Sequence, residues 1–352
     1  MFSCLHFENF RSIQTLDIEN LSRINLFFGK NNCGKTTVLE SIFMLCGLSN
    51  PQLPINCNSF RGYHITRDLS FFFNNFDTSK EIVLSSDGAP RNFQRNMRLT
   101  LQEVFHRTTT QKEFPVTGSI NNQNTVDTLQ IKSSIPSDID SENFVSSLQL
   151  RPLKDGLEID YQVPQAYKET IFCNYFPPAV SFEIIVPIIQ KVFKEKQEAK
   201  VLQVLQKIDP RIKNFVLIDD VVMVDIGFTN RIPINMLGDG VRKFFTLIVA
   251  LHNSANGVLL VDEIDNGLHF SSMQKLWEII LDAAQFYNVQ LFATTHNIDS
   301  LKGLAKNIET IHDNSAKVSL YKILEKGGGV KKALHYDASS FVSVIEQENE
   351  VR

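Results

Sequence analysis

The sequence predicts an α/β fold in which a sheet of mostly parallel strands is covered by helices and interrupted by an inserted α+β region. Short apolar runs typical of strands buried on both faces, INLFF at 24–28 and GVLLV at 257–261, alternate with helical stretches. This alternation is found at both ends of the chain, in 1–50 and 211–352. The segment between them, 51–210, lacks it. We therefore expect one core built from both ends and interrupted by 51–210, although two domains in series would give the same order.

The two core segments contain a definite series of expected elements. The first should contain strands at 2–7, 13–18 and 24–28. They should be followed by a helix that ends at Gly47 and carries on one stripe Val38, Leu39, Ile42, Phe43 and Cys46. The second should contain strands at 216–218, 221–226, 257–261 and 289–296, with helices after Gly240, at 271–286 and, a short one, from Asn297.

The inserted segment has a different character. Strands are expected at 81–85, 97–105, 128–132 and 157–163. Most of 106–146 should be exposed loop, because it is rich in Thr, Gln, Asn and Ser. A helical region should run from Val180 to Ile208, with KEKQEAK as a solvated interruption and Pro187 near a first turn.

Composition excludes several classes of protein. The apolar fraction of 43% and charged fraction of 21% are those of a globular chain. A net charge of −4 argues against a charge-driven grip on nucleic acid by the whole surface, but it leaves room for a local basic groove. No apolar run is long enough for a membrane span, and no secretory signal is recognisable. With five cysteines and no CxxC, we expect free thiols in a cytoplasmic protein.

A glycine-rich loop between the strand at 24–28 and the following helix is the most informative motif. It reads GKNNCGKT at 29–36 and matches G-x-x-x-x-G-K-[ST], the P-loop. Backbone N–H groups and the helix N-terminus would surround a phosphate, Lys35 would reach the β- and γ-phosphates, and the Thr36 hydroxyl would bind Mg²⁺. The residues expected to bind the nucleotide are Gly29, Asn31, Asn32, Cys33, Gly34, Lys35, Thr36 and Thr37.

Two later strands end in residues suited to the same chemistry. The strand at 257–261 is followed by Asp262, which can hold Mg²⁺, and Glu263, which can orient or deprotonate water. The strand VQLFATTH ends at His296, where ligands of α/β sheets bind. LGDG at 237–240 precedes a helix and would form an anion site or an ordinary turn capped by Asp239.

The order of these motifs resembles that of ABC ATPases, and in detail the OLD-like, RecF-like and SMC-like branch. FENFRSI at 7–13 looks like that branch's opening, LGDG stands at the signature, DEIDNGLH at 262–269 is similar to its Walker B and D-loop, and ATTH at 293–296 to its histidine switch. The likeness covers about 1–50 and 230–300 well, and 51–229 loosely. It implies an ABC-type fold that binds ATP and Mg²⁺ and hydrolyses ATP.

The resemblance also implies roles for single residues. Arg11 would lie near the nucleotide, Asn31 would fill the asparagine position of the P-loop, and His296 would sense the γ-phosphate, with Lys35 and Glu263 as the other catalytic residues. Gly238, Asp239 and Gly240 would cap the ATP of a second subunit, so a homodimer or higher homo-oligomer is expected. Gly238 stands where the signature usually has serine, which predicts slow turnover. For the switch glutamine, FFFNNFD at 71–77 is the best candidate stretch.

The same branch implies partners. Some OLD-like proteins carry a TOPRIM nuclease domain, and about 50 residues after His296 are too few for one. Asp138 and Asp140 form a DxD, but within a Ser/Pro/Asn-rich stretch expected to be loop. We therefore expect an ATPase that is not itself a nuclease and that controls a separate effector, a nuclease, in bacterial anti-phage defence. The alternative is a RecF-like clamp with DNA as partner. The FENFRSI segment at 7–13 and the LGDG turn do not fit the third class considered, a transporter ATPase.

Overall fold

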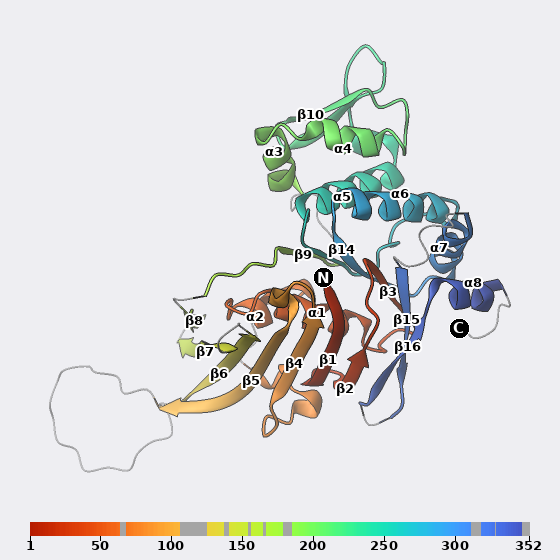
Figure 1. Ribbon diagram of the computed structural model, residues 1–352. Helices are drawn as coiled ribbons and strands as arrows, with labels where there is room; N and C mark the ends of the chain where they lie inside the picture. Colours follow the sequence, from red (N-terminus) through yellow and green to blue (C-terminus); the bar gives the residue numbers. More distant parts are fainter. Residues whose placement is uncertain are drawn as a thin grey trace, which may run out of the picture.

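The computed structural model describes residues 1–63, 68–105, 125–136, 141–153, 156–164, 167–178, 185–310, 318–327 and 329–346. Two large sheets enclose helix α1 (Lys35–Cys46), and the remaining large helices lie on the far side of one of them (Figure 1). Ten of the twelve residues of α1 are buried, because the helix has a sheet on either side. The P-loop helix is therefore the centre of the molecule.

The first sheet has six strands and carries the predicted parallel core. Its order is β16-β15-β3-β14-β13-β9, and every pair is parallel except β15 with β16. The strands are β3 (Ile24–Phe28), β9 (Cys173–Phe176), β13 (Val258–Val261), β14 (Gln290–Thr295), β15 (Val318–Glu325) and β16 (Lys331–Tyr336). All residues of β3, β13 and β14 are buried, as continuous apolar runs predict. The predicted α/β class is confirmed.

Alternate side chains of these strands enter two cores. Leu26 and Phe28 pack with the helices on the far face, whereas Phe27 packs toward α1. The far face is covered by α5 (Asp239–Asn253), α6 (Met273–Phe286), α7 (Ile298–Thr310) and α8 (Ala338–Glu346). The helices predicted after Gly240, at 271–286 and from Asn297 are confirmed, although α7 is a full helix rather than a short one.

A smaller lobe packs on α5 (Figure 1). It contains α3 (Val186–Lys194), α4 (Glu198–Leu205), β10 (Asn214–Ile218), β11 (Val221–Asp225) and β12 (Ile232–Pro233). The predicted helical region is confirmed over its described part, since α3 and α4 are separated by a turn at 195–197 within KEKQEAK. Pro187 lies in the first turn of α3, as expected. The start of the predicted region, 180–184, lies outside the described residues.

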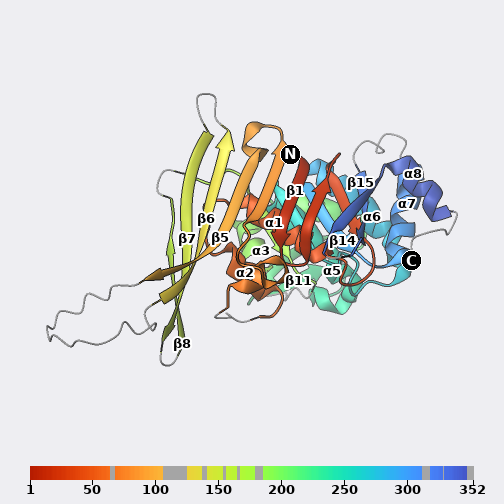
Figure 2. The same cartoon turned by 90° about the horizontal axis from the view of Figure 1, so that it is seen from below.

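The second sheet is antiparallel throughout, in the order β2-β1-β4-β5-β6-β7-β8 (Figure 2). Its strands are β1 (Phe2–Phe10), β2 (Ile13–Ile18), β4 (Ile82–Gly88), β5 (Arg95–Phe105), β6 (Thr125–Pro136), β7 (Ser141–Leu153) and β8 (Gly156–Gln162). α2 (Leu53–Phe60) follows α1 in the chain.

Because β1 pairs with β4 and β9 pairs with β13, both sheets contain strands from 51–210 and from the core segments. The division into core and insertion remains a prediction.

The predicted strand at 128–132 lies within β6 and is confirmed, but the expectation of loop is wrong for the rest of the described part of 106–146. Residues 125–136 and 141–146 belong to β6 and β7, which pair in register with β5 and with each other. The polar residues that suggested loop alternate with Leu129, Ile131 and Leu148, which face the core. Gln130 and Lys132 reach the wet face that an antiparallel sheet can have, while Ser133 and Ser146 are themselves buried, so composition alone misleads. Residues 106–124 and 137–140, with Asp138 and Asp140, lie outside the described residues.

Candidate nucleotide-binding site

The P-loop forms a tight turn between β3 and α1. Gly29 has φ 143° and Gly34 has φ 106°, in the region that favours glycine, and Asn32 has φ 62°. A side chain at Gly29 would also meet the carbonyl oxygen of Ile323, 2.9 Å from an added Cβ. The loop therefore leads straight into the N-terminus of a buried helix, where the partial positive charge of the helix favours an anion.

Lys35 lies across this loop. Its Nζ donates to the carbonyl oxygens of Gly29 at 3.0 Å and Lys30 at 2.9 Å, and its side chain is largely buried. Cys33 is buried beneath it, with its Sγ 4.0 Å from the Lys35 Nζ, whereas Asn31 and Asn32 are exposed. An ammonium group, a helix N-terminus and a ring of backbone groups thus converge, which is the chemistry that binds a chain of phosphates.

The acidic strand ends directly beside the P-loop. The Thr36 hydroxyl donates to Asp262 Oδ2 at 2.7 Å, and the Thr294 hydroxyl donates to Asp262 Oδ1. The backbone N–H of Glu263 donates to Thr294 Oγ1 at 2.8 Å. Because β3, β14 and β13 are neighbours in that order, the three predicted motifs meet at one edge of the sheet. Asp262 is buried and fixed by two hydroxyl groups.

Glu263 and His296 form the outer part of this edge. Glu263 has φ 48°, a conformation that non-glycine residues seldom adopt, and such strain is concentrated at functional sites. Its Oε1 lies 3.5 Å from the Nδ1 of His296, and about a third of the Glu263 side chain and half of that of His296 are exposed. Unlike Asp262, Glu263 is therefore accessible to water.

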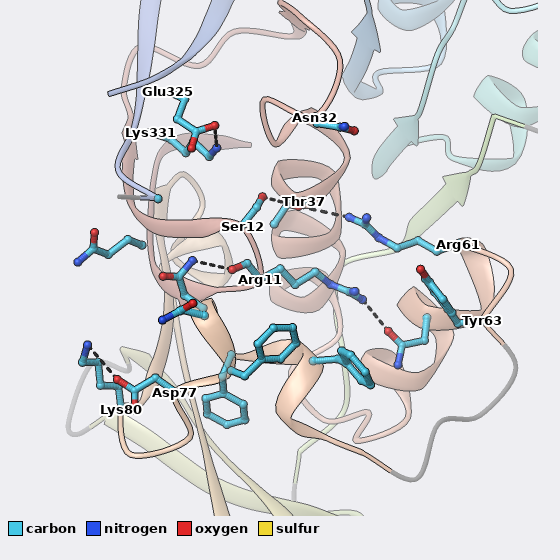
Figure 3. A pocket seen from close by; sticks show the side chains of 18 residues that line it. Arg11, Ser12, Asn32, Thr37, Arg61, Tyr63, Asp77, Lys80, Glu325 and Lys331 are labelled. Carbon is cyan, nitrogen blue, oxygen red and sulfur yellow. Dashed lines mark hydrogen bonds and ion pairs between the residues drawn. The ribbon is translucent and has the colours of Figure 1, made fainter. Parts of the chain in front are cut away.

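A cavity of about 840 Å³ adjoins the P-loop (Figure 3). Thr37 and Asn32 of the P-loop form one wall. The others contain Ser12, Tyr63 and, from the β15–β16 hairpin, the ion pair of Lys331 Nζ with Glu325 Oε2 at 2.7 Å. Since Thr37 follows the residues expected to bind phosphate, we expect the nucleoside end of a nucleotide in this cavity.

Arg11 and Arg61 reach this cavity with a common counter-ion. Both contact Glu40 of α1, whose carboxylate is fully buried. Burial lowers the pKa of Arg11 and outweighs the opposing effect of Glu40. At Arg61 burial also lowers the pKa, but the hydrogen bonds that Arg61 donates to Glu40 outweigh it and the net shift is upward. Arg11 was predicted near the nucleotide. Arg61 and Glu40 were missed, because no motif surrounds them.

LGDG lies apart from the cavity. Gly238, at φ 97°, caps α5, which begins at Asp239. An added Cβ on Gly240 would lie 3.9 Å from Leu268, in the segment after the acidic strand. Among the described residues, those that line the cavity include none from 237–240. The role of the signature-like turn in binding a phosphate therefore remains a prediction.

The stretch FFFNNFD at 71–77 forms part of the cavity wall in two short 3₁₀ turns. Asn74 Nδ2 donates to the carbonyl oxygen of Arg11 at 2.7 Å, which ties this stretch to the β1–β2 turn. It thus lies beside the region expected for the nucleoside. A switch role for it remains a prediction.

The residues at the sheet edge fit Mg²⁺. The Thr36 hydroxyl and the Asp262 carboxylate are oxygen donors, which Mg²⁺ prefers. Within the described part of the chain no group of three or more His, Cys, Asp or Glu could hold a metal ion by itself. Two oxygen ligands from protein, completed by phosphate and water, are the usual arrangement for Mg²⁺ at nucleotides.

A protein-family model also matches this chain. The family model described as "AAA domain, putative AbiEii toxin, Type IV TA system" matches residues 123–301, 179 of the 352 residues. The chain belongs to this family. The matched stretch contains Asp262, Glu263 and His296, while the P-loop precedes it. AAA domains are P-loop proteins, in agreement with the loop at 29–36.

Individual proteins are similar to this chain at lower identity. An "ATP/GTP phosphatase" of Helicobacter pylori is 23% identical over 322 residues, which are 84% of this chain and 85% of that protein. "Uncharacterized protein MJECL10" of Methanocaldococcus jannaschii is 45% identical over 42 residues, 12% of this chain and 19% of that protein.

Among solved structures, the SmcHead bound to the C-winged helix domain of ScpA is similar with a TM-score of 0.49 and 13% identity, covering 96% of this chain and 97% of that one. The SMC head domain from Thermotoga maritima has a TM-score of 0.43 and 10% identity, covering 96% and 99%. In the described part of this chain, none of the helices combines the length and apolar character needed to cross a membrane.

Proposed function

We propose that this protein binds ATP with Mg²⁺ and hydrolyses it as an ABC-type ATPase. The observation that carries this is the hydrogen bond from Thr36 to Asp262, which joins the P-loop to the acidic strand. Two motifs 226 residues apart in sequence meet where a P-loop enzyme needs them. The full-length likeness to an "ATP/GTP phosphatase" supports the same activity.

Each residue at the sheet edge has a defined task. Lys35 and the backbone N–H groups at the start of α1 bind the β- and γ-phosphates and offset their charge. Thr36 and Asp262 would hold Mg²⁺, which would supply charge neutralisation between the phosphates. Glu263 orients a water molecule and accepts its proton, and His296, 3.5 Å from its carboxylate, lies where it can contact the γ-phosphate.

The test is phosphate release by the purified protein. We expect turnover of ATP that requires Mg²⁺ and stops with EDTA. A protein that binds ATP but releases no phosphate, alone or as an oligomer, would reduce the proposal to ATP binding. A protein with no affinity for ATP, ADP or GTP would overturn it.

A second part of the proposal is that two copies share each ATP. LGDG does not line the cavity of its own chain, and the resemblance to ABC ATPases supports a cap on the ATP of a second subunit. Gly240→Asp and Lys35→Ala then damage different halves of each composite site. Mixing the two inactive proteins should restore part of the activity, since some mixed dimers contain one intact site. No recovery in samples shown by mass to contain mixed dimers would place hydrolysis within one subunit.

The biological role we propose is a cytoplasmic ATPase that regulates a separate effector, a nuclease, in bacterial anti-phage defence. It rests on the resemblance to OLD-like ATPases, and the family's description names a toxin of a toxin–antitoxin system, another role with a partner protein. The purified protein with ATP and Mg²⁺ or Mn²⁺ should leave DNA and RNA intact. Cleavage abolished by Asp138→Ala with Asp140→Ala would contradict this. ATP-dependent retention of DNA would instead favour the RecF-like clamp.

A further inference from the structure

Glu40 has an environment that the ATPase chemistry described above does not use. It lies on α1 five residues after Lys35, and its side chain has no exposed surface. Arg61 donates to it twice, from Nε at 2.7 Å and from Nη2 at 2.9 Å. The Nε of Arg11 lies 3.0 Å from its second oxygen. One buried carboxylate therefore holds two guanidinium groups.

A cluster of charges in a protein interior contributes little to the stability of a fold. Glu40 is fully buried and the side chain of Arg11 is 11% exposed, whereas about a third of the Arg61 side chain reaches solvent. Burial of a charge costs several kcal/mol per ion, and apolar residues of similar volume often stabilise as well or better. Two guanidinium groups also repel each other, and Arg61 indeed lowers the pKa of Arg11. Glu40 is the carboxylate in contact with both cations. Asp262 also raises the pKa of Arg61, but its oxygens accept from Thr36 and Thr294, so positive charge remains in excess at the two arginines. A further negative group is the natural complement.

Both arginines face the side where that group would lie. They line the cavity beside the P-loop, and Arg61 Nη2 also donates to Thr37 Oγ1 at 3.3 Å. Figure 3 shows the guanidinium of Arg61 pointing toward Thr37. Arg11 is held from other directions by Asn58 Oδ1, at 2.9 Å from its Nη2, and by the ring of Phe72, 5.2 Å from its Cζ.

The two arginines come from segments that could not hold them alone. Arg11 lies in the turn between β1 and β2 with φ 51°, and Arg61 is the residue at which α2 ends. Neither position lies inside a helix or strand. Glu40, in contrast, belongs to the most buried helix of the molecule and to the same rigid element as the P-loop lysine.

We propose that Glu40 is a positioning residue that fixes Arg11 and Arg61 as donors to the phosphate nearest the nucleoside. This inference rests on the proposed nucleotide site, and it adds that Glu40 holds two of the side chains of that site in place. Glu40 does not touch the nucleotide. It sets where the two guanidinium groups lie relative to Thr37, and it keeps their combined charge at a value that one phosphate can balance.

The experiment compares Glu40→Gln with the unaltered protein for binding of ATP, AMP and adenosine. We expect ATP and AMP affinity to fall on the order of tenfold, because charge-assisted hydrogen bonds to phosphate lose their geometry. Adenosine, measured by competition, should bind as before. A loss shared equally by adenosine would indicate a general change of structure, and unchanged ATP affinity in a folded variant would overturn the proposal.

A matched control is available in Glu169→Gln. Glu169 pairs with the buried Arg95, 2.6 Å from its Nη2, and neither residue lines the nucleotide cavity. This variant should lower the melting temperature without changing the ratio of AMP to adenosine affinity. If Glu40→Gln does not fold, Glu40→Asp keeps the charge but shortens the reach. It should give a smaller loss of AMP affinity, and wild-type affinity would contradict the positioning role.

A double-mutant cycle separates an action through Arg61 from a direct one. In an Arg61→Ala background, the effect of Glu40→Gln on ATP affinity should be much smaller than in the unaltered protein. Additive losses would show that Glu40 does not act through Arg61. The outcomes remain distinct from failure of the ATPase proposal: absence of ATP binding by the unaltered protein refutes that proposal before any Glu40 variant is compared.

Discussion

The two sheets contribute to the site in different ways. In the six-stranded sheet, three neighbouring parallel strands end at one edge, and the residues that follow them provide the P-loop, the acidic pair and the histidine. The seven-stranded antiparallel sheet instead contributes Arg11, from the turn between β1 and β2. The parallel sheet thus supplies the groups for phosphate chemistry, and the antiparallel sheet supplies part of the wall around the nucleoside.

This difference has a physical origin. Parallel strands direct all their carboxyl ends the same way, so a short motif after each strand is enough to build a site. Antiparallel strands alternate in direction, and the residues they bring to one place come from unrelated parts of the chain. We expect substitutions at the parallel edge to abolish binding or turnover, and those at the cavity wall to change affinity and selectivity.

The largest effect is expected for Lys35→Ala. It removes the buried ammonium group that crosses the P-loop, and loss of such a charge at a phosphate should weaken ATP binding by about a hundredfold or more. Equilibrium binding of labelled ATP measures this. Lys30→Ala is the control, because Lys30 is exposed and contributes to the loop through its backbone oxygen. Normal affinity of Lys35→Ala would refute the P-loop assignment.

Glu263→Gln should separate binding from turnover. The backbone N–H of Glu263 keeps its bond to Thr294, so the edge of the sheet stays intact while the general base is lost. We expect ATP affinity close to that of the unaltered protein and hydrolysis reduced about 10²–10⁴-fold. Asp262→Asn, at the buried ligand position, should impair both binding with Mg²⁺ and turnover. Equal turnover by Glu263→Gln would assign the base elsewhere.

The contrast between the parallel edge and the cavity wall also explains which site residues the sequence predicts. The P-loop, Asp262, Glu263 and His296 were predictable, because each belongs to a contiguous motif that follows an apolar strand. Glu40 and Arg61 were not. They carry no local pattern, and their meeting depends on the path of the chain through α2, which propensities do not specify.

The fold shows a similar division. Continuous apolar runs predict the strands buried on both faces, whereas the composition of 141–146 predicts loop where the structure has the first part of β7. The pairing of β1 with β4, and of β9 with β13, links distant segments that no local signal connects. Long-range pairing of this kind follows from the packing of the whole chain and is not contained in any window of the sequence.

A moderate effect is expected at the cavity wall. Phe71 lines the cavity and is 45% exposed, in edge-to-face contact with Phe76 at 5.5 Å. If a base stacks there, Phe71→Ala should lower ATP affinity about tenfold and leave binding of inorganic triphosphate unchanged. Phe270→Ala is the control, because Phe270 is 63% exposed and does not line the cavity. Equal losses for both ligands would place the base elsewhere.

The smallest effect concerns the outer face of the antiparallel sheet, away from the site. His6 on β1 lies between Asp17, 2.6 Å from its Nδ1, and Glu8, 3.0 Å from its Nε2. Burial lowers the pKa of His6, but the bonds to Asp17 and Glu8 outweigh it and the pKa is raised above 6.5. The charged form therefore stabilises the fold fully below about pH 6.5, and this contribution is lost as the pH rises through the folded pKa. In His6→Gln it is absent, so the unaltered protein should melt ~1–2 °C above the variant at pH 6, with a smaller difference at pH 8.5. His252 on α5 should have the opposite effect on stability. Burial lowers its pKa, so the neutral form is favoured in the folded protein and His252 destabilises the fold as the pH falls. Melting curves of His6→Gln and His252→Gln over this pH range should diverge in opposite directions from those of the unaltered protein. Parallel curves for all three proteins would show that the Asp17 and Glu8 bonds to His6 are too weak in solution to matter.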